Sequence, residues 1–481
     1  NLWSQTNSSS PKKAEASRAV TTLEKNKNPH FSQSVNQARQ FAPNGIVKCT
    51  TAEHNQELQQ RGLAPTDEQF EAWLAPKIQE LKLRRQTNPN EVQGVITIPV
   101  VIHVIHNGDA YGTGENIRDE QVLSQIQVMN QDFRRMSGTP GFGPGVDVEI
   151  EFCLAQTDPN GNPTTGINRV NLGIASFDRA GVEGNLKPNT IWDPTQYLNM
   201  WTCRFSGDLN GVLGYAQFPS ASGLAGLAAN GGAATTDGVI MAYNAFGSSA
   251  IYPAGLYLAP YDRGRTTTHE VGHWLGLRHI WGDGGCTVDD FCADTPVAGA
   301  ANFGCPTGTD SCPTSPGLDQ IQNYMDYTDD TCMDRFTQNQ KERMLTVMSV
   351  SPRRASLASS TKCQAPAPFI QFGNTTGSII ESTNCNYVDV SYPVTIARAA
   401  TANAEVTFSV TGGTATQNID YQIVTPSVTF PAGTTAPQNL VVRFFNDGII
   451  ESNEIIIIDL VLNANGGNAV LNNAAKTITI T

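Results

Sequence analysis

The chain has 481 residues, which is too long for one ordinary core and predicts two or three folded units. Hydrophobic residues make up 39% and charged residues 16% of the sequence, which is typical of globular proteins and excludes disordered or fibrous classes. The formal net charge of −13 argues against nucleic acid or anionic membrane as the main partner. It favours cationic ligands, including calcium and basic peptide segments.

The first part of the chain contains two regions of different character. Residues 1–37 are polar, rich in Ser, Lys and Asn, and lack apolar periodicity, so we expect a flexible leader there. Residues 52–86 carry helical patterns in two pieces that separate near Gly62 and Pro65, and a polar linker follows. We therefore expect residues 38–93 to form a small unit that is mostly helical or irregular.

The middle and the end of the chain predict two fold classes. The β-branched alternation of residues 95–108 predicts a strand and the periodicity of residues 118–136 predicts a helix, so an α/β-type unit begins near residue 94. After a Pro-containing linker over residues 356–367, short Val-, Ile- and Thr-rich segments alternate with Gly, Pro, Asn and Asp turns. Residues 368–481 are therefore expected to form an all-β sandwich.

Three of the seven histidines lie within the segment TTTHEVGHWLGLRHIWGD. His269 and His273 are four residues apart, so on a helix both project from one face and can bind one zinc ion. Glu270 then lies beside the metal, where a general base for the attacking water must sit. An HExxH pattern alone is weak evidence, because it also occurs on ordinary helix surfaces.

His279 makes the pattern specific. On a continuous helix it would face away from the other two histidines, but Gly276 allows the helix to end in a left-handed conformation and the chain to turn back. His279 then becomes the third ligand, and a fourth position stays open. Three protein ligands with one open position are typical of catalytic zinc, whereas structural zinc has four protein ligands.

The segment HEVGHWLGLRH resembles the long zinc signature of the metzincin metallopeptidases, and NYMDY, with Met325, resembles their Met-turn. With the Cys-rich loop that contains DTP and GCP, these motifs look most like the pappalysin family, in particular its bacterial ulilysin- and mirolysin-like members. The resemblance covers roughly residues 95–350 and departs from the family pattern at no metal-site position. It implies an α+β metzincin catalytic domain with an α/β-type upper subdomain over residues 94–355.

The resemblance assigns roles to residues around the metal. Met325 would form the apolar floor under the histidines, and the Tyr327 phenol would hydrogen-bond the oxyanion of the tetrahedral intermediate. Ordinary core packing is the alternative for Tyr327. Asp330, with Asp329 as second choice, matches a position in the pocket for the residue after the cleaved bond. A buried carboxylate there would favour cleavage before Arg or Lys.

The loop over residues 286–334 contains five of the ten cysteines and has no CxxC pair. Disulfides in an oxidising compartment are therefore favoured over a second metal cluster, and we expect secretion. The family spacing implies the pairs Cys286–Cys312 and Cys305–Cys332. The cysteines without an expected partner are Cys153, Cys203 and Cys292.

The same loop is one-sidedly acidic, because it contains aspartates but no Lys, Arg or Glu. Family members hold calcium here, and the expected ligands are Asp290 and the carbonyls of Ala293 and Thr295. A solvated acidic loop without a bound ion is the alternative.

Cys49 precedes the expected catalytic domain. A thiolate binds zinc strongly and would occupy the open position in place of the catalytic water. The family uses such a cysteine switch, so we expect residues 38–93 to be an inhibitory propeptide, although Thr50 stands where relatives often have Gly. A free or disulfide-bonded Cys49 is the alternative. Self-cleavage near Arg84 and Arg85 is expected to activate the zymogen.

Residues 368–481 resemble Calx-β domains through GGTATQNIDYQI, VTFPAGT and FFNDGIIESNEIIIIDLVL. The acidic positions that match are Glu381, Asp420, Asp447, Glu451 and Glu454. Their oxygens suit calcium, but carboxylates in turns are often only solvated. Cys363 and Cys385 are expected to form a disulfide at the entrance of this domain.

The sequence thus predicts a secreted or cell-surface-attached zinc metalloendopeptidase in zymogen form, with one catalytic zinc ion and structural calcium. We expect a monomer that acts on proteins and peptides, that has no nucleic-acid partner or transmembrane segment, and that is inhibited by its own propeptide. The alternative is an extracellular adhesive or matrix-binding protein with a vestigial zinc domain, against which the intact Glu270 argues.

Overall fold

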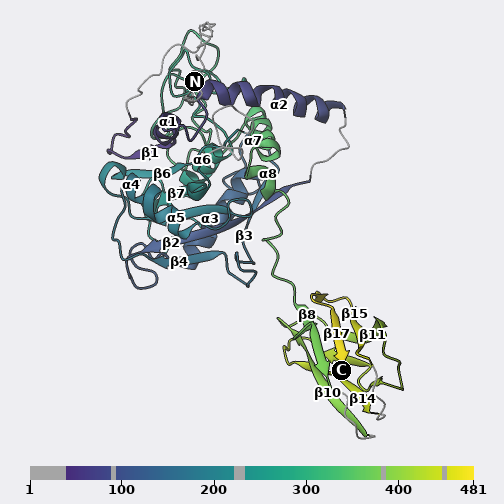
Figure 1. Cartoon of the computed structure of the whole chain (residues 1–481). Coiled ribbons are helices and arrows are strands. Elements are labelled where there is room, and N and C mark those ends of the chain that lie inside the picture. The colour runs from purple at the N-terminus through teal and green to yellow at the C-terminus, as the bar shows by residue number, and fades with distance from the viewer. Residues whose placement is uncertain (1–38, 88–93, 222–232, 381–385, 447–451) are drawn as a thin grey trace, which may run out of the picture. The chain divides into compact units, whose positions relative to one another are not determined.

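The computed structural model describes residues 39–87, 94–221, 233–380, 386–446 and 452–481. The chain divides into two compact units, Asn1–Cys153 with Ile167–Ser360 and Leu154–Gly166 with Thr361–Thr481 (Figure 1). We call the described residues 39–87 the N-terminal segment. The domain boundaries expected from the sequence remain predictions.

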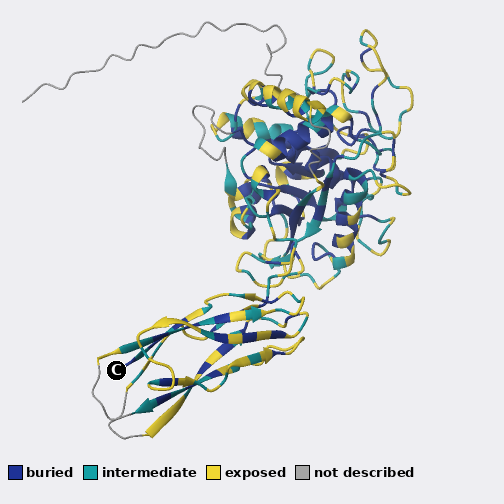
Figure 2. Cartoon of the chain, turned by 90° about the vertical axis from the view of Figure 1, so that its right-hand side faces the viewer, coloured by how far each residue is buried: buried dark blue, intermediate teal, exposed yellow. Residues whose placement is uncertain are grey.

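The first unit is built on one mixed sheet with the strand order β1-β6-β7-β5-β2-β3, in which β4 also pairs with β2. The strands are β1 (Val47–Cys49), β2 (Ile96–His106), β3 (Ile150–Leu154), β4 (Ile167–Asn171), β5 (Leu198–Cys203), β6 (Val212–Ala216) and β7 (Val239–Ala242). Strands β2, β5 and β7 run parallel, β6 is antiparallel to β7, and β1 lies parallel to β6 at the edge. The central strands are buried almost throughout, as expected of a sheet covered on both faces (Figure 2).

The helices of the first unit include the two helical pieces expected over residues 52–86. They are α1 (Thr51–Gln60), α2 (Asp67–Thr87), α3 (Asp119–Phe133), α4 (Arg179–Gly181), α5 (Lys187–Thr190), α6 (Arg265–Trp274), α7 (Gln338–Val350) and α8 (Arg354–Leu357), with a π-helical turn at Val182–Leu186 and 3₁₀ turns at Gly207–Leu209, Ala234–Thr236 and Tyr243–Ala245. Helix α7 begins at a capping box formed by Thr337 and Gln340. Arg84 and Arg85, the expected self-cleavage site, lie in the last turn of α2, so cleavage there requires this turn to unwind.

The two faces of strand β6 contact different parts of the unit, and one of them positions helix α6. Strand β6 turns Gly214 toward Glu270 of α6, since a Cβ on Gly214 would lie 3.1 Å from the Glu270 Cγ. The next residue, Tyr215, faces the opposite side and packs in a buried cluster with Trp201 and Leu186. Helix α6 therefore lies over the face of β6 and β7 to which Gly214 turns.

The second unit is a sandwich of two five-stranded sheets, with the orders β12-β14-β10-β8-β16 and β13-β11-β15-β17-β9. The strands are β8 (Phe369–Phe372), β9 (Thr376–Ile379), β10 (Asn386–Ile396), β11 (Ala404–Gly413), β12 (Tyr421–Ile423), β13 (Ser427–Phe430), β14 (Gln438–Asn446), β15 (Glu454–Asn463), β16 (Val470–Leu471) and β17 (Ala475–Ile480). In β11, Ala404, Val406 and Phe408 are buried while the residues between them are exposed. This alternation confirms the predicted all-β sandwich.

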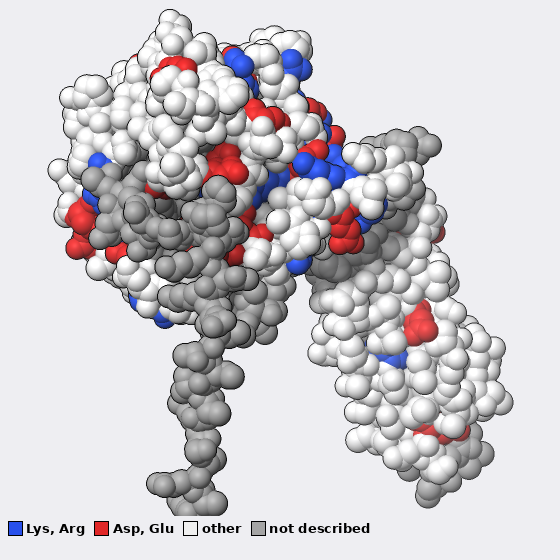
Figure 3. Space-filling model, turned by 90° about the horizontal axis from the view of Figure 1, so that it is seen from above, with Lys and Arg blue, Asp and Glu red and all other residues white. Residues whose placement is uncertain are grey.

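On the face shown in Figure 3, Lys and Arg side chains lie among Asp and Glu side chains and do not form a separate basic field. No helix among the described residues is long and apolar enough to cross a membrane.

Candidate active site

Helix α6 carries His269 and His273, and a chain reversal follows directly after it. Gly276 adopts a φ of 90°, a left-handed conformation that residues with a Cβ rarely adopt. A Cβ at this position would also lie 2.9 Å from the Val347 Cγ2, so glycine is required by space as well. The reversal predicted from Gly276 brings His279 back to the other two histidines.

The three imidazoles converge through their Nε2 atoms. These atoms are 3.1 Å apart between His269 and His273, 3.0 Å between His273 and His279, and 3.3 Å between His269 and His279. Their Nδ1 atoms lie 2.7 Å from the Tyr324 carbonyl, 2.8 Å from the Leu277 carbonyl and 2.5 Å from the Asp283 carboxylate, respectively. Since these oxygens accept hydrogen bonds, each Nδ1 holds the proton and each Nε2 presents a lone pair. Three lone pairs that face one another call for a cation.

Cys49 completes this group from the N-terminal segment. One potential ligand atom of Cys49 and of each histidine lies within 4.8 Å of the others, and all four residues are buried. Burial lowers the pKa of His269 and of His273, so both imidazoles stay neutral, as metal ligands must be. Imidazole nitrogen and cysteine sulfur are zinc's preferred donors, so this set of residues fits zinc.

Glu270 lies directly beside this group and is covered by the N-terminal segment. The Thr51 hydroxyl donates to Glu270 Oε2 over 2.8 Å, and Cys49 Sγ lies 3.4 Å from the same oxygen. The Ala216 amide in turn donates to the Thr51 hydroxyl over 2.8 Å. Burial in this covered state raises the pKa of Glu270 to about 8.

Met325 and Tyr327 both lie against the histidines. A Cβ on Gly272 of α6 would lie 2.5 Å from the Met325 Sδ, so the thioether packs directly on the helix beneath the ligands. The Tyr327 ring lies 4.9 Å from that of His279, measured between ring centroids, and its hydroxyl donates to the Cys49 carbonyl over 3.1 Å.

Asp330 is buried, and its Oδ2 accepts hydrogen bonds from the backbone amides of Arg263 and Arg265 at 2.9 and 3.1 Å. Its Oδ1 lies 3.6 Å from the Nζ of Lys48, which is buried and donates to the Thr328 carbonyl over 2.7 Å. Asp329 is only partly buried. Of the two aspartates, Asp330 is therefore the one that carries a paired, buried charge.

A family model described as pregnancy-associated plasma protein-A matches residues 185–349. The extracellular metalloprotease of Colletotrichum graminicola is 36% identical over 252 residues, which cover 52% of this chain and 75% of that protein. The chain belongs to the pappalysin family of zinc metallopeptidases. The extracellular metalloprotease of Pyricularia oryzae is 32% identical over 281 residues, which cover 58% of this chain and 84% of that protein.

Two further similarities extend the comparison. A Calx-beta domain model matches residues 365–481, in agreement with the sandwich of the second unit. The solved structure of mature mirolysin from Tannerella forsythia in complex with a cleaved peptide is 41% identical, with a TM-score of 0.47, over 55% of this chain and 96% of its own.

Sequence reasoning missed two residues of this pappalysin site. Lys48 reaches Asp330, and Thr51 covers Glu270, both through contacts more than two hundred residues apart in the chain. The signal for Lys48 was present, because a basic residue directly precedes the expected switch cysteine and the expected specificity is basic. No local pattern distinguishes Thr51 from Thr50.

The structure contains both expected disulfides, Cys286–Cys312 and Cys305–Cys332. Cys203 and Cys292, which had no expected partner, are free and buried, and Cys153 and Cys363 are disulfide-bonded. Cys385, the expected partner of Cys363, lies outside the described residues.

The residues expected to bind calcium remain predictions. The Asp290 carboxylate accepts hydrogen bonds from the Thr295 hydroxyl at 2.7 Å and the Cys292 amide at 3.0 Å, while Ala293 is exposed. In the second unit, the Asp420 carboxylate accepts from the Thr416 amide over 2.6 Å, and Glu454 begins β15. The other three expected ligands, Glu381, Asp447 and Glu451, lie outside the described residues.

Proposed function

We propose that this chain is the latent precursor of a secreted zinc metalloendopeptidase that cleaves peptide bonds before Arg or Lys. One observation carries the proposal: the consecutive residues Lys48 and Cys49 lie against Asp330 and against the three histidines, respectively. A segment in this position excludes substrate from the pocket and from the metal at once. The N-terminal segment therefore acts as a propeptide and an intramolecular inhibitor.

Catalysis depends on groups that the propeptide now covers. Bound zinc supplies an activated water and polarises the scissile carbonyl. Glu270 accepts the proton of the attacking water and passes it to the leaving amine. The Tyr327 hydroxyl, which donates to the Cys49 carbonyl over 3.1 Å, donates instead to the oxyanion of the substrate once the propeptide has left.

The preference for a basic residue after the cleaved bond rests on Asp330. Its Oδ1 has no hydrogen-bond partner among the described residues, and the ammonium of Lys48 lies near it in a buried setting. A substrate Arg is longer than Lys48 and presents a fork of donors that matches a carboxylate. Arg should therefore be preferred over Lys, and both over neutral residues.

Secretion is supported by the relatives, which are named extracellular metalloproteases, and by the two disulfides of the 286–334 loop. Structural calcium at Asp290 and at Asp420 is part of the proposal. A calcium chelator that spares zinc would then lower the melting temperature, whereas an unchanged melting temperature would remove calcium from the proposal. Monomeric state and attachment to a cell surface remain predictions.

The first experiment is a digest of a denatured protein mixture by the purified chain, before and after removal of the propeptide. Mass spectrometry would read every new N-terminus, with and without a zinc chelator. We expect the processed form alone to produce new termini that begin with Arg or Lys. We expect no new termini when the zinc chelator is present. Cleavage without a basic preference would overturn the specificity, and equal activity of both forms would overturn latency.

The adhesive alternative is tested by the Glu270→Ala protein. If that protein retained the biological activity of the unmodified chain, the zinc domain would be dispensable and the binding function would replace the peptidase. Loss of activity with unchanged zinc content supports the enzyme.

A further inference from the structure

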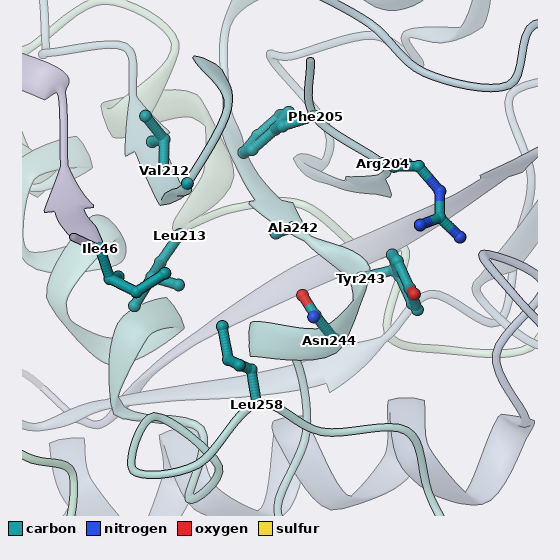
Figure 4. Close-up of a pocket in the computed structure, with 10 residues that line it drawn as sticks. Ile46, Arg204, Phe205, Val212, Leu213, Ala242, Tyr243, Asn244 and Leu258 are labelled. Atoms are coloured by element: carbon teal, nitrogen blue, oxygen red, sulfur yellow. The ribbon is translucent and has the colours of Figure 1, made fainter. Parts of the chain in front are cut away.

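A pocket lies beside the edge of the sheet where the propeptide meets β6. It has a volume of about 150 Å³ and is bordered by Ile46 of the propeptide. Its other lining residues belong to the catalytic unit and are Arg204, Phe205, Gly211, Val212, Leu213, Ala242, Tyr243, Asn244 and Leu258. Figure 4 shows the Ile46 side chain next to Leu213, with Arg204 and Tyr243 at the side away from Ile46. None of the catalytic or specificity roles proposed above involves this pocket.

The pocket is apolar near Ile46 and polar at the far end. Leu213, Leu258 and Ala242 supply hydrocarbon walls. At the far side the Arg204 guanidinium lies over the Tyr243 ring, 5.1 Å from its centroid, and is paired with Glu115. The guanidinium is thus already neutralised, so the pocket has no free charge to offer a charged ligand. Its chemistry fits a large apolar side chain.

The position of Ile46 relates the pocket to the specificity site. Ile46 directly precedes β1, and Lys48 lies two residues further on, so an extended chain points both side chains to the same side. Lys48 reaches Asp330 while Ile46 borders the pocket. The Asp330 site and the pocket at Ile46 therefore follow one another along a strand that pairs with β6.

A bound substrate must run past the metal, the Asp330 site and the pocket with its chain direction opposite to that of the propeptide. In the propeptide, the residue at the Asp330 pocket, Lys48, comes before the residue at the metal, Cys49. In a substrate cleaved before a basic residue, the carbonyl at the metal comes first and the basic residue follows it. Reversal of the chain places the third residue after the cleaved bond where Ile46 now lies.

We propose that this pocket is a second specificity site, which takes a large apolar side chain, such as Leu, Met or Phe, at the third residue after the cleaved bond. The inference rests on the proposed cleavage before Arg or Lys. Space remains beside Ile46, so a longer side chain than Ile fills the pocket better. Removal of the propeptide opens the pocket together with the Asp330 site.

The test uses the full chain after processing and a peptide library with Arg fixed after the cleaved bond. The residue three positions after that bond is varied, and kcat/KM is measured for each peptide. We expect Leu, Met and Phe to exceed Ser and Asp by about tenfold. Equal rates at this position, with the Arg preference intact, would overturn the second site alone. Loss of the Arg preference itself would overturn the proposed function instead.

A substitution then assigns the preference to the pocket. Leu258→Asp places a carboxylate on its wall and should shift the preference at the third position to Arg and Lys, leaving the position after the bond unchanged. Leu256→Asp is the matched control, because Leu256 is 36% exposed two residues away and does not line the pocket. An identical profile in both variants would contradict the assignment. The unmodified enzyme's library profile needs no variant, so the inference stays testable if Leu258→Asp fails to fold.

Discussion

The Glu71 carboxylate of helix α2 accepts hydrogen bonds from both terminal nitrogens of Arg343 in helix α7, at 2.7 and 2.5 Å. The Arg278 Nε donates to the same carboxylate over 2.9 Å, and all three side chains are largely buried. The N-terminal segment is therefore anchored by a buried ion pair that is separate from the histidine cluster. Phe70 and Leu74 of the same helix also pack with Val347 of α7 in a buried apolar cluster.

Glu71→Gln should loosen α2 from the catalytic unit by about 3 kcal/mol, because it leaves the buried Arg343 guanidinium without its counter-charge, while Arg278 keeps Asp67 as a partner. Hydrogen exchange of the α2 amides, read by mass spectrometry in a Glu270→Ala background that prevents self-cleavage, measures this change. Glu68→Gln is the control, since Glu68 is exposed on the same helix. Equal exchange in both variants would mean that the ion pair contributes no net anchoring.

His54 should make propeptide binding sensitive to pH. Its ring is buried against Tyr215, and neither ring nitrogen has a hydrogen-bond partner among the described residues, although Glu183 lies 3.8 Å away. Burial lowers the pKa of His54 from 6.5 to about 3. A released His54 takes up a proton below pH 6.5 while a docked one does not, so docking weakens as the pH falls from 6.5 toward 3, by up to about 1.4 kcal/mol per pH unit.

Self-processing of the zymogen, followed from pH 7.5 to 5, measures this effect after correction for the pH profile of the processed enzyme. His54→Phe preserves the ring contact and should flatten the dependence of self-processing on pH. His106→Gln changes a histidine outside the docking contact and should leave that dependence as it is. A dependence that survives His54→Phe would place the sensitive group elsewhere.

Cys49→Ser should activate the unprocessed chain, because a hydroxyl is a far weaker zinc ligand than a thiolate. The activity of the uncleaved protein toward a short Arg-containing peptide should rise at least tenfold over the unmodified chain. Cys292→Ser, which changes another free buried thiol, is the control. If both variants stay inactive, contacts of the N-terminal segment other than that of Cys49, such as those of Lys48, Thr51 and Glu71, maintain latency.

Asp330→Asn should remove the preference for basic residues in the processed enzyme. Loss of the charge that faces a buried substrate cation costs about 2–5 kcal/mol, or roughly 30- to 5,000-fold in kcat/KM for an Arg substrate. Asp329→Asn is the matched control and tests the second candidate, which is only partly buried. A larger loss in Asp329→Asn would reverse the assignment.

Glu270→Gln should lower kcat of the processed enzyme by about 10²–10⁴-fold, because a positioned general base contributes about that much. Zinc content, measured by mass spectrometry of the metal, should stay at that of the unmodified protein, since the three histidines are unchanged. A loss of zinc together with activity would show that Glu270 supports the metal site.

The geometry among residues that lie close together in the chain could be predicted from the sequence alone. The helical spacing of His269 and His273, the left-handed turn at Gly276, the return of His279 and the alternation in strands such as β11 all follow from backbone geometry over a few residues. Such rules depend on local sterics and on the helix or strand period, which a single chain displays directly.

Only the tertiary structure decided how the N-terminal segment fits the site. Lys48 at Asp330, Thr51 at Glu270 and Glu71 at Arg343 join residues that lie more than two hundred positions apart. These contacts depend on β1 pairing parallel with β6, in the register of Cys49 with Gly214, and on α2 packing against α7. A one-residue change of register would turn Lys48 to the other side of the strand, and no local pattern specifies that register.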